Sequence, residues 1–127
     1  MNNLGLNFLV VGLGGFMGAI TRYAIYLFEG KLNYSFPFGT LIINTIGCLL
    51  AGIFMGWATK SNPHIRHFIV LGSIGYIGSF TTYSTFGAET IQLFRANQML
   101  YAFSNVALNL ILGFGAVWIG AKWMEPN

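Results

Sequence analysis

Charged residues are scarce in this chain, and their scarcity indicates its class. Only 7% of the 127 residues are charged, Asp is missing altogether, and 55% are hydrophobic. A soluble domain carries about 25% charged residues, which keep its surface hydrated. The sequence therefore predicts an integral membrane protein, with lipid as one of its partners.

Cysteine and catalytic motifs are also nearly absent. The lone Cys48 excludes an internal disulfide and a metal site made of several cysteines. Six scattered basic residues are too few to bind nucleic acid. No phosphate-binding loop, nucleophile elbow or zinc signature is present, so we expect neither an enzyme nor a nucleic-acid partner.

Long apolar segments are what the chain has in plenty. Four of them reach the length of about 20 residues that a membrane-spanning helix needs. None alternates with a period of two, so strands are not expected. We predict an all-α fold with one transmembrane domain over residues 1–127, whose consecutive spans are antiparallel. The predicted spans are residues 4–28, 37–59, 65–95 and 99–121.

The third segment is longer than one bilayer crossing, and it combines glycines with hydroxyl residues. Gly72, Gly75 and Gly78 precede a cluster of threonine and serine. These features favour a helix broken near residues 75–82. Unwound backbone at membrane depth is tolerated where protein or a water-filled cavity satisfies it, and such breaks hold ions in transporters. A continuous, tilted helix packed through its small residues is the alternative.

Basic residues are balanced between the two sides that four spans would create. Orientation in a membrane follows an excess of Lys and Arg on the cytoplasmic side, and here the count is three on each side. One interpretation is insertion in both directions and pairing with an inverted copy; the other is that His64, His67 or an insertion partner decides. The two sets are Lys60, Arg66 and Lys122 against Arg22, Lys31 and Arg95.

Polar residues inside the first two spans each allow a structural and a functional interpretation. Arg22 either extends to the interface or forms a cationic vestibule for anions. Asn44, on one helix face with Thr40, is either an interhelical hydrogen-bonding residue or a donor that lines a pore. Gly14 and Gly18 are spaced for close helix packing.

The later spans carry further candidates. A carboxylate within a span, as at Glu89, is costly and usually functional. Aromatic ring edges are partly positive, so Tyr83 and Phe86 could stabilise a small anion, although such rings are more often core or lipid-facing. Tyr101, Asn105 and Asn109 lie on one helix face, as packing contacts or as a wet surface.

Three motifs together resemble the Fluc fluoride channel family, also called CrcB type. They are Gly14-Gly15-x-x-Gly18-x-x-x-Arg22, Gly39-Thr40-x-x-x-Asn44, and Gly75-x-x-Gly78-x-x-Thr81-Thr82-Tyr83-Ser84-Thr85-Phe86-x-x-Glu89, and the resemblance covers nearly the whole chain.

The resemblance implies a fluoride-selective channel in the bacterial inner membrane. It implies passive fluoride export that relieves toxicity, through two pores of an antiparallel, dual-topology homodimer. It also implies a structural Na⁺ ion at the dimer interface, held by the backbone carbonyls of Gly78 and Thr81. The fluoride pathway that it implies includes Arg22, Thr40, Asn44, Tyr83, Ser84, Thr85, Phe86, Glu89, Asn105 and Asn109.

Several positions depart from the family pattern. Tyr83 stands where the family has Phe, which adds a hydroxyl, and Ser79 replaces the second of two glycines. Asn105 and Gly113 replace a usual Tyr and a usual hydroxyl residue, so the route along the last span differs in detail.

Two other functions compete with a channel. A small proton-coupled exporter would need a titrating carboxylate facing a cavity, and Glu89 is the candidate. A membrane scaffold subunit could use the glycine faces, but it would not need polar side chains in register along the last span.

Overall fold

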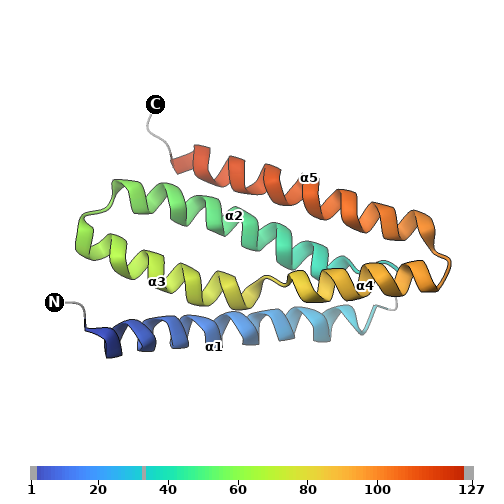
Figure 1. The fold of residues 1–127 in the computed structure, drawn as a ribbon, viewed down its shortest axis with the longest axis horizontal. Coiled ribbons are helices and arrows are strands. Elements are labelled where there is room, and N and C mark those ends of the chain that lie inside the picture. The colour runs from blue at the N-terminus through green and yellow to red at the C-terminus, as the bar shows by residue number, and fades with distance from the viewer. Residues whose placement is uncertain (1–2, 33, 125–127) are drawn as a thin grey trace.

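All regular secondary structure in the described part of the chain is helical. The computed structural model describes residues 3–32 and 34–124. Five helices follow one another along the chain (Figure 1). They are α1 (Leu4–Glu29), α2 (Phe38–Lys60), α3 (Pro63–Phe80), α4 (Tyr83–Arg95) and α5 (Met99–Met124). The prediction of an all-α fold is confirmed for these residues.

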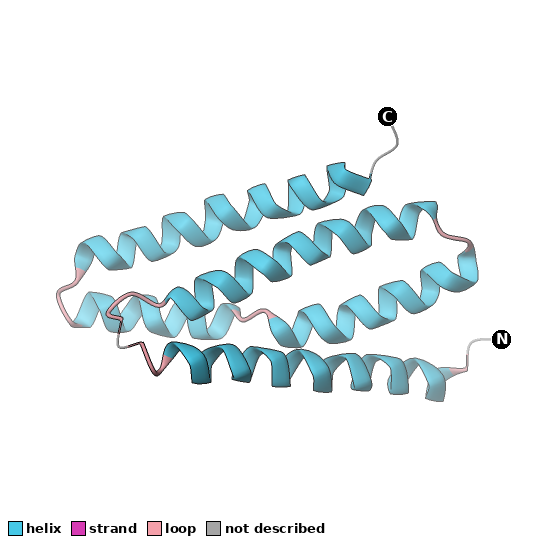
Figure 2. Cartoon of the chain, turned by 180° about the vertical axis from the view of Figure 1, so that it is seen from behind, coloured by secondary structure: helices cyan, strands magenta, loops and turns pink. Residues whose placement is uncertain are grey.

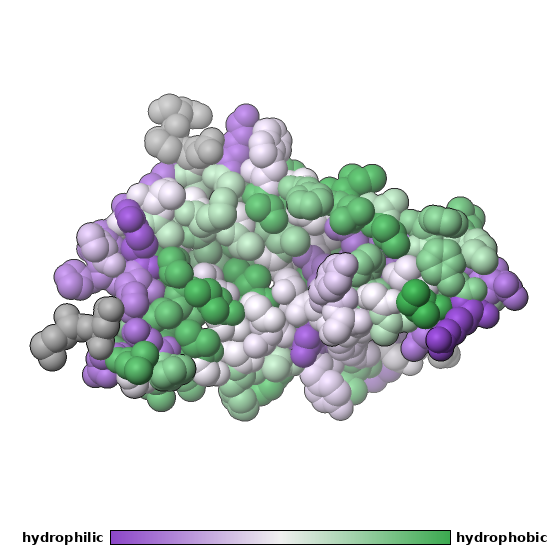
Figure 3. All heavy atoms as spheres, viewed as in Figure 1, coloured by the Kyte–Doolittle hydropathy of each residue, from purple (hydrophilic) through white to green (hydrophobic). Residues whose placement is uncertain are grey.

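The outside of the helices is strongly apolar. Helices α1, α2 and α5 are each long and apolar enough to cross a membrane. Many large apolar side chains are exposed, including Phe8 (70%), Leu100 (76%) and Phe114 (74%). The most hydrophilic residues on the visible face gather toward the two ends of the long axis (Figure 3). Such a surface suits a bilayer, and the protein is an integral membrane protein.

Two helices, α3 and α4, occupy the third apolar segment. They follow each other along the molecule and are joined by Thr81 and Thr82 (Figure 2). The chain then turns through Asn97, whose φ of 58° lies in the left-handed region. Asn adopts this conformation more readily than most residues, which allows the tight connection to α5.

Side-chain caps define where the helices begin. The side chain of Asn3 accepts a hydrogen bond from the N–H of Leu6 at the start of α1. Asn62 accepts one from the N–H of Ile65, and Pro63 follows it in the first turn of α3. These caps satisfy N–H groups that have no partner inside a helix.

The first helix pair, α1 and α3, runs in the same direction. His67 Nε2 lies 2.8 Å from Asn7 Oδ1 toward the N-terminal ends of both helices. Farther along, a Cβ added at Gly18 would overlap the backbone oxygen of Tyr76 and lie 3.1 Å from the backbone nitrogen of Phe80. The close packing predicted from the glycine spacing is thus present, and its partner is α3.

The second pair, α2 and α5, is also parallel. Asn44 contacts Asn109 toward the N-terminal part of both helices. Toward their C-terminal ends, a Cβ at Gly52 would overlap the backbone oxygen of Val117, and one at Gly120 would overlap that of Leu49. Consecutive spans, with α3 and α4 counted as one, run in opposite directions, as predicted, yet these closest contacts join helices that run the same way (Figure 1).

The centre of the molecule is partly polar. Its largest fully buried side chains are Phe80, Ile43, Asn105 and Thr40. Two of these four carry polar groups that must be hydrogen-bonded where water is excluded. Their partners define the candidate site.

Candidate functional site

The site is built around the interruption between α3 and α4. Thr81 (φ −74°, ψ 157°) and Thr82 (φ −149°, ψ 108°) are extended. In a continuing helix the N–H of Thr82 would donate to the carbonyl of Gly78. It donates instead to Asn44 Oδ1 at 2.9 Å. The Thr82 hydroxyl accepts a hydrogen bond from the N–H of Thr85 at 3.2 Å and so caps α4.

Asn44 connects the interruption to the neighbouring helices. Its Nδ2 donates to the carbonyl of Thr82 at 3.3 Å and to Asn109 Oδ1 at 3.0 Å. Its Oδ1 accepts from the N–H of Thr82. Because both amide hydrogens have protein acceptors, Asn44 holds the backbone of the interruption in this conformation.

The amide contacts continue along α5. Asn109 Nδ2 donates to the carbonyl of Asn105 at 2.9 Å and to its Oδ1 at 3.0 Å. Asn105, with no exposed surface, donates to Thr90 Oγ1 at 3.0 Å. Tyr101 lies apart from these amide contacts. Its side chain is 42% exposed, and its ring packs edge-on against Phe36. The predicted polar stripe is therefore divided, and its two asparagines form interhelical contacts.

An aromatic pair lies beside these amides. The ring centroids of Tyr83 and Phe86 are 5.6 Å apart and the rings are tilted by 52°. A cavity of about 310 Å³ is lined by both rings and by the side chains of Asn44 and Asn109. The structure thus brings four of the predicted pathway residues to one cavity.

Two more predicted residues reach this cavity only indirectly. Ser84 Oγ lies 3.3 Å from Thr82 Oγ1, and Thr85 Oγ1 accepts a hydrogen bond from Thr82 Oγ1 at 2.9 Å. Thr82 itself lines the cavity. The hydroxyls therefore form a polar cluster at the start of α4, next to the aromatic rings.

A carboxylate cluster lies farther along α4. The buried hydroxyl of Thr40 donates to Glu89 Oε1 at 2.8 Å, and Tyr26 Oη lies 3.1 Å from the same hydroxyl. Glu89 Oε2 is buried without a hydrogen-bond partner among the described residues. Thr40 and Glu89 are thus in direct contact, apart from the aromatic cavity.

A second cavity opens beside Glu89. It has a volume of about 360 Å³ and is lined by Glu29 and Glu89 together with Gln92, Gln98 and other residues. Glu29 Oε1 also accepts a hydrogen bond from the N–H of Gly39 at 2.6 Å and so holds the start of α2. Two carboxylates therefore face one cavity.

Arg22 reaches the interruption from α1. Its Nη1 donates to the carbonyl of Thr81 at 3.5 Å. This carbonyl is one of the two that the resemblance assigns to sodium. The other belongs to Gly78, whose usual helical donor is occupied by Asn44. Backbone carbonyls with spare acceptor capacity are suitable ligands for a hard cation, so these two groups fit the chemistry of the ion.

Side-chain metal ligands are not gathered in the described ranges. In residues 3–32 and 34–124, no three His, Cys, Asp or Glu side chains lie together in a way that could hold a metal ion. The oxygens beside the interruption include those of the backbone, of the Asn44 amide and of the Thr81 and Thr82 hydroxyls.

Sequence reasoning missed two residues of the carboxylate cluster, Tyr26 and Glu29. The first predicted span ended at residue 28, whereas α1 extends through Glu29. The spacing in the sequence could have identified Tyr26, because it lies four residues after Arg22 and thus on the same helix face. The partners of that face, however, depend on the fold.

Comparison with known proteins identifies similar chains over most of this length. A family model described as "CrcB-like protein, Camphor Resistance (CrcB)" matches residues 9–121. A relative from Dehalococcoides mccartyi, named "Fluoride-specific ion channel FluC", is 40% identical over 114 residues, which cover 89% of this chain and 88% of the relative.

Two further relatives carry the same name. The protein from Campylobacter lari is 41% identical over 113 residues, covering 88% of this chain and 92% of its own. The protein from Shewanella loihica is 42% identical over 125 residues, covering 96% and 95%. The similarity extends across all five helices, including the interruption.

Proposed function

The chain belongs to the CrcB-like family, and we propose that it is a passive fluoride channel. It would export fluoride across the bacterial inner membrane and so relieve fluoride toxicity. The name of its relatives supports the ion. The cavity at the helix interruption, where two aromatic rings meet two asparagines, is the observation that carries the proposal.

The chemistry of that cavity suits a small anion. Fluoride must lose much of its hydration shell to cross a narrow apolar site, and polar groups must replace the lost water. The partly positive edges of Tyr83 and Phe86 provide attraction without a formal charge. The hydroxyls of Ser84 and Thr85 follow along α4.

Asn44 would contribute by exchanging partners. In the structure both of its amide hydrogens are donated, to Thr82 and to Asn109. An ion entering the cavity would replace one of these acceptors, while the other keeps the side chain in place. Asn109 donates hydrogen bonds to Asn105, which would hold the Asn109 side chain in place while Asn44 exchanges its hydrogen-bond acceptor for the ion.

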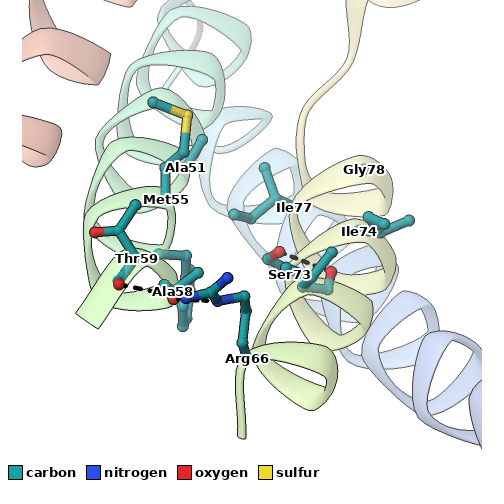
Figure 4. A pocket seen from close by; sticks show the side chains of 11 residues that line it. Ala51, Met55, Ala58, Thr59, Arg66, Ser73, Ile74, Ile77 and Gly78 are labelled. Carbon is teal, nitrogen blue, oxygen red and sulfur yellow. Dashed lines mark hydrogen bonds between the residues drawn. The ribbon is translucent and has the colours of Figure 1, made fainter. Parts of the chain in front are cut away.

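We propose that two oppositely inserted copies form the working channel, with one pore each. Tyr83 is 84% exposed, so a single chain leaves one wall of the aromatic cavity open. An apolar groove of about 660 Å³ between α2 and α3 also reaches Gly78, beside the interruption (Figure 4). A second copy would cover both surfaces, and the interruption would then lie inside the membrane.

A sodium ion at the centre of this dimer completes the proposal. The carbonyls of Gly78 and Thr81 from both copies would hold it. When bound, the ion supplies positive charge to the C-terminal ends of the α3 helices, where the helix dipole is negative. The chain's own contribution is the extended backbone at Thr81 and Thr82, which turns carbonyls away from helical partners.

Growth in fluoride tests the function in cells. Expression of this chain in a bacterium that lacks its own fluoride exporter should restore growth in medium containing fluoride. Phe86→Ile, expressed to the same level in the membrane, is the matched control and should not. If the unaltered chain reaches the membrane and gives no protection, the proposal is wrong. Protection against organic cations instead would favour a proton-coupled exporter using Glu89.

A further inference from the structure

Arg22 lies beside the C-terminal end of α3 because of how α1 and α3 pack. Gly18 brings the two backbones together at Tyr76 and Phe80. Arg22 follows one turn later on α1, at the level where α3 has just ended. Its guanidinium contacts the carbonyl of Thr81, so a positive charge from one helix reaches the terminus of another.

The end of α3 has a physical need for such a charge. The last carbonyls of a helix lack intrahelical donors, and the dipole places partial negative charge there. The last turn of α3 contains no basic residue, and its cap, Thr81, is extended rather than turned back onto the helix. Arg22 is therefore a cation supplied from outside the helix.

The end of α2 shows the same arrangement with a different arginine. Arg66 Nε donates to the carbonyl of Ala58 at 2.9 Å, and its Nη2 lies 3.5 Å from the carbonyl of Thr59 (Figure 4). Lys60 stands in the last turn as well. Arg66 therefore serves as a comparison for Arg22 within the same chain, because it contacts the end of a helix at a loop and not at the interruption.

We propose that Arg22 is a positioning residue that acts as a built-in cation of the helix interruption. Its guanidinium occupies one side of the Thr81 carbonyl and keeps the extended backbone in place when sodium is low. The second lone pair of that carbonyl stays available to a metal ion. Since like charges repel, Arg22 also weakens the binding of sodium at this carbonyl. This second effect rests on the sodium site proposed above.

The sodium dependence of thermal stability tests this role. The full chain is purified in sodium and then unfolded thermally across a range of sodium concentrations, with choline keeping the ionic strength constant. The unaltered protein should lose little stability without sodium. Arg22→Gln should melt markedly lower without sodium and be rescued at a half-saturating concentration about tenfold lower.

Two variants serve as controls. Arg22→Lys keeps the charge and should restore much of the sodium-free stability. Arg66→Gln should lower the melting temperature equally at every sodium concentration, because its guanidinium contacts the last carbonyls of α2 and not those of Thr81 or Gly78.

The outcomes separate this role from the sodium site itself. If sodium raises the melting temperatures of the unaltered protein and of Arg22→Gln by the same amount and at the same concentrations, the role of Arg22 is wrong and the sodium site stands. If neither responds, both the sodium site and the inference fail, and fluoride transport remains to be judged by its own assay. Arg22→Gln that cannot be recovered folded even in saturating sodium would also overturn the inference, since sodium should then replace the missing charge.

Discussion

Asn44 is the residue on which the site depends most. It donates to the carbonyl of Thr82 and to Asn109, and it accepts from the N–H of Thr82. One side chain thus fixes the backbone of the interruption and connects it to α5.

Asn44→Asp should abolish most fluoride transport. The carboxylate would face the oxygens of Thr82 and Asn109 without a hydrogen to donate, and it would place a negative charge in an anion pathway. Two lost hydrogen bonds of about 0.6 kcal/mol each destabilise the local geometry, and the charge adds a larger barrier. Fluoride efflux from liposomes, with the folded state checked by gel filtration, measures the effect. Unchanged efflux would remove Asn44 from the pathway.

Phe86→Ile should impair transport while the protein stays folded. The substitution keeps an apolar side chain of moderate size but removes the partly positive ring edge beside Tyr83. Tyr83→Phe is the matched control, because it keeps the ring and deletes only an exposed hydroxyl. Efflux rates and elution volumes of both variants give the comparison. Loss of folding in Phe86→Ile would instead make the ring a packing element.

The sequence predicted which residues belong to the site better than it predicted which of them touch. Asn44, Asn109, Tyr83 and Phe86 were identified from polarity and aromatic spacing, and the structure brings them to one cavity. Their roles in transport stay predictions. The contact of Tyr26 with Thr40 was not foreseeable, because it depends on how α1 lies against α2.

At the scale of helices, glycines determine the pairing. The spacing of Gly14 and Gly18 predicted close packing, and the structure adds Gly75 as the matching residue on α3. The pair Gly52 and Gly56 has the same spacing on α2 but was not singled out, although both face α5. Sequence spacing reveals a packing face, whereas the choice of partner requires the fold.

Gly18→Ala should separate α1 from α3 and destabilise the protein. Its methyl group would overlap the backbone oxygen of Tyr76, which cannot move without shifting α3. Overpacking of this kind costs about 1–3 kcal/mol. Gly12→Ala on the same helix is the control, since its methyl group meets no atom beyond its own helix backbone within 4 Å. Thermal unfolding in detergent distinguishes them, and equal midpoints would contradict the close contact.

The helix interruption illustrates how sequence and structure differ in detail. Glycines and hydroxyl residues predicted a break near residues 75–82, and the helix ends at Phe80. Gly75 faces the backbone of Val11, so it serves packing. Just beyond the end of α3, the N–H of Thr82 donates a hydrogen bond to Asn44 on α2. No local pattern contains that contact.

At the scale of the whole molecule, charge bears on orientation. The start of α1, the connection between α2 and α3, and the end of α5 lie toward the same end (Figure 1). Arg22 sits at the interruption instead of at an end. From the sequence, three basic residues were counted on each side. Without Arg22, three remain at one end and two at the other, namely Lys60, Arg66 and Lys122 against Lys31 and Arg95.

Lysines added to one terminus should force one orientation and lower activity. Orientation responds to small differences in Lys and Arg, and the ends of this molecule differ by one. Two variants biased in opposite directions should each be weak alone and active when expressed together. Accessibility of a single labelled cysteine reports orientation. Full activity in a population that faces one way would contradict the antiparallel dimer.

Fluoride release from liposomes is the measurement that bears most directly on the account. The purified protein is reconstituted, potassium is shunted with valinomycin, and external fluoride is followed with an electrode while chloride is followed in parallel. We expect fast fluoride release without chloride release, and neither in liposomes lacking protein. Folded protein that releases no fluoride, or releases chloride as readily, would contradict a fluoride-selective pathway at the helix interruption.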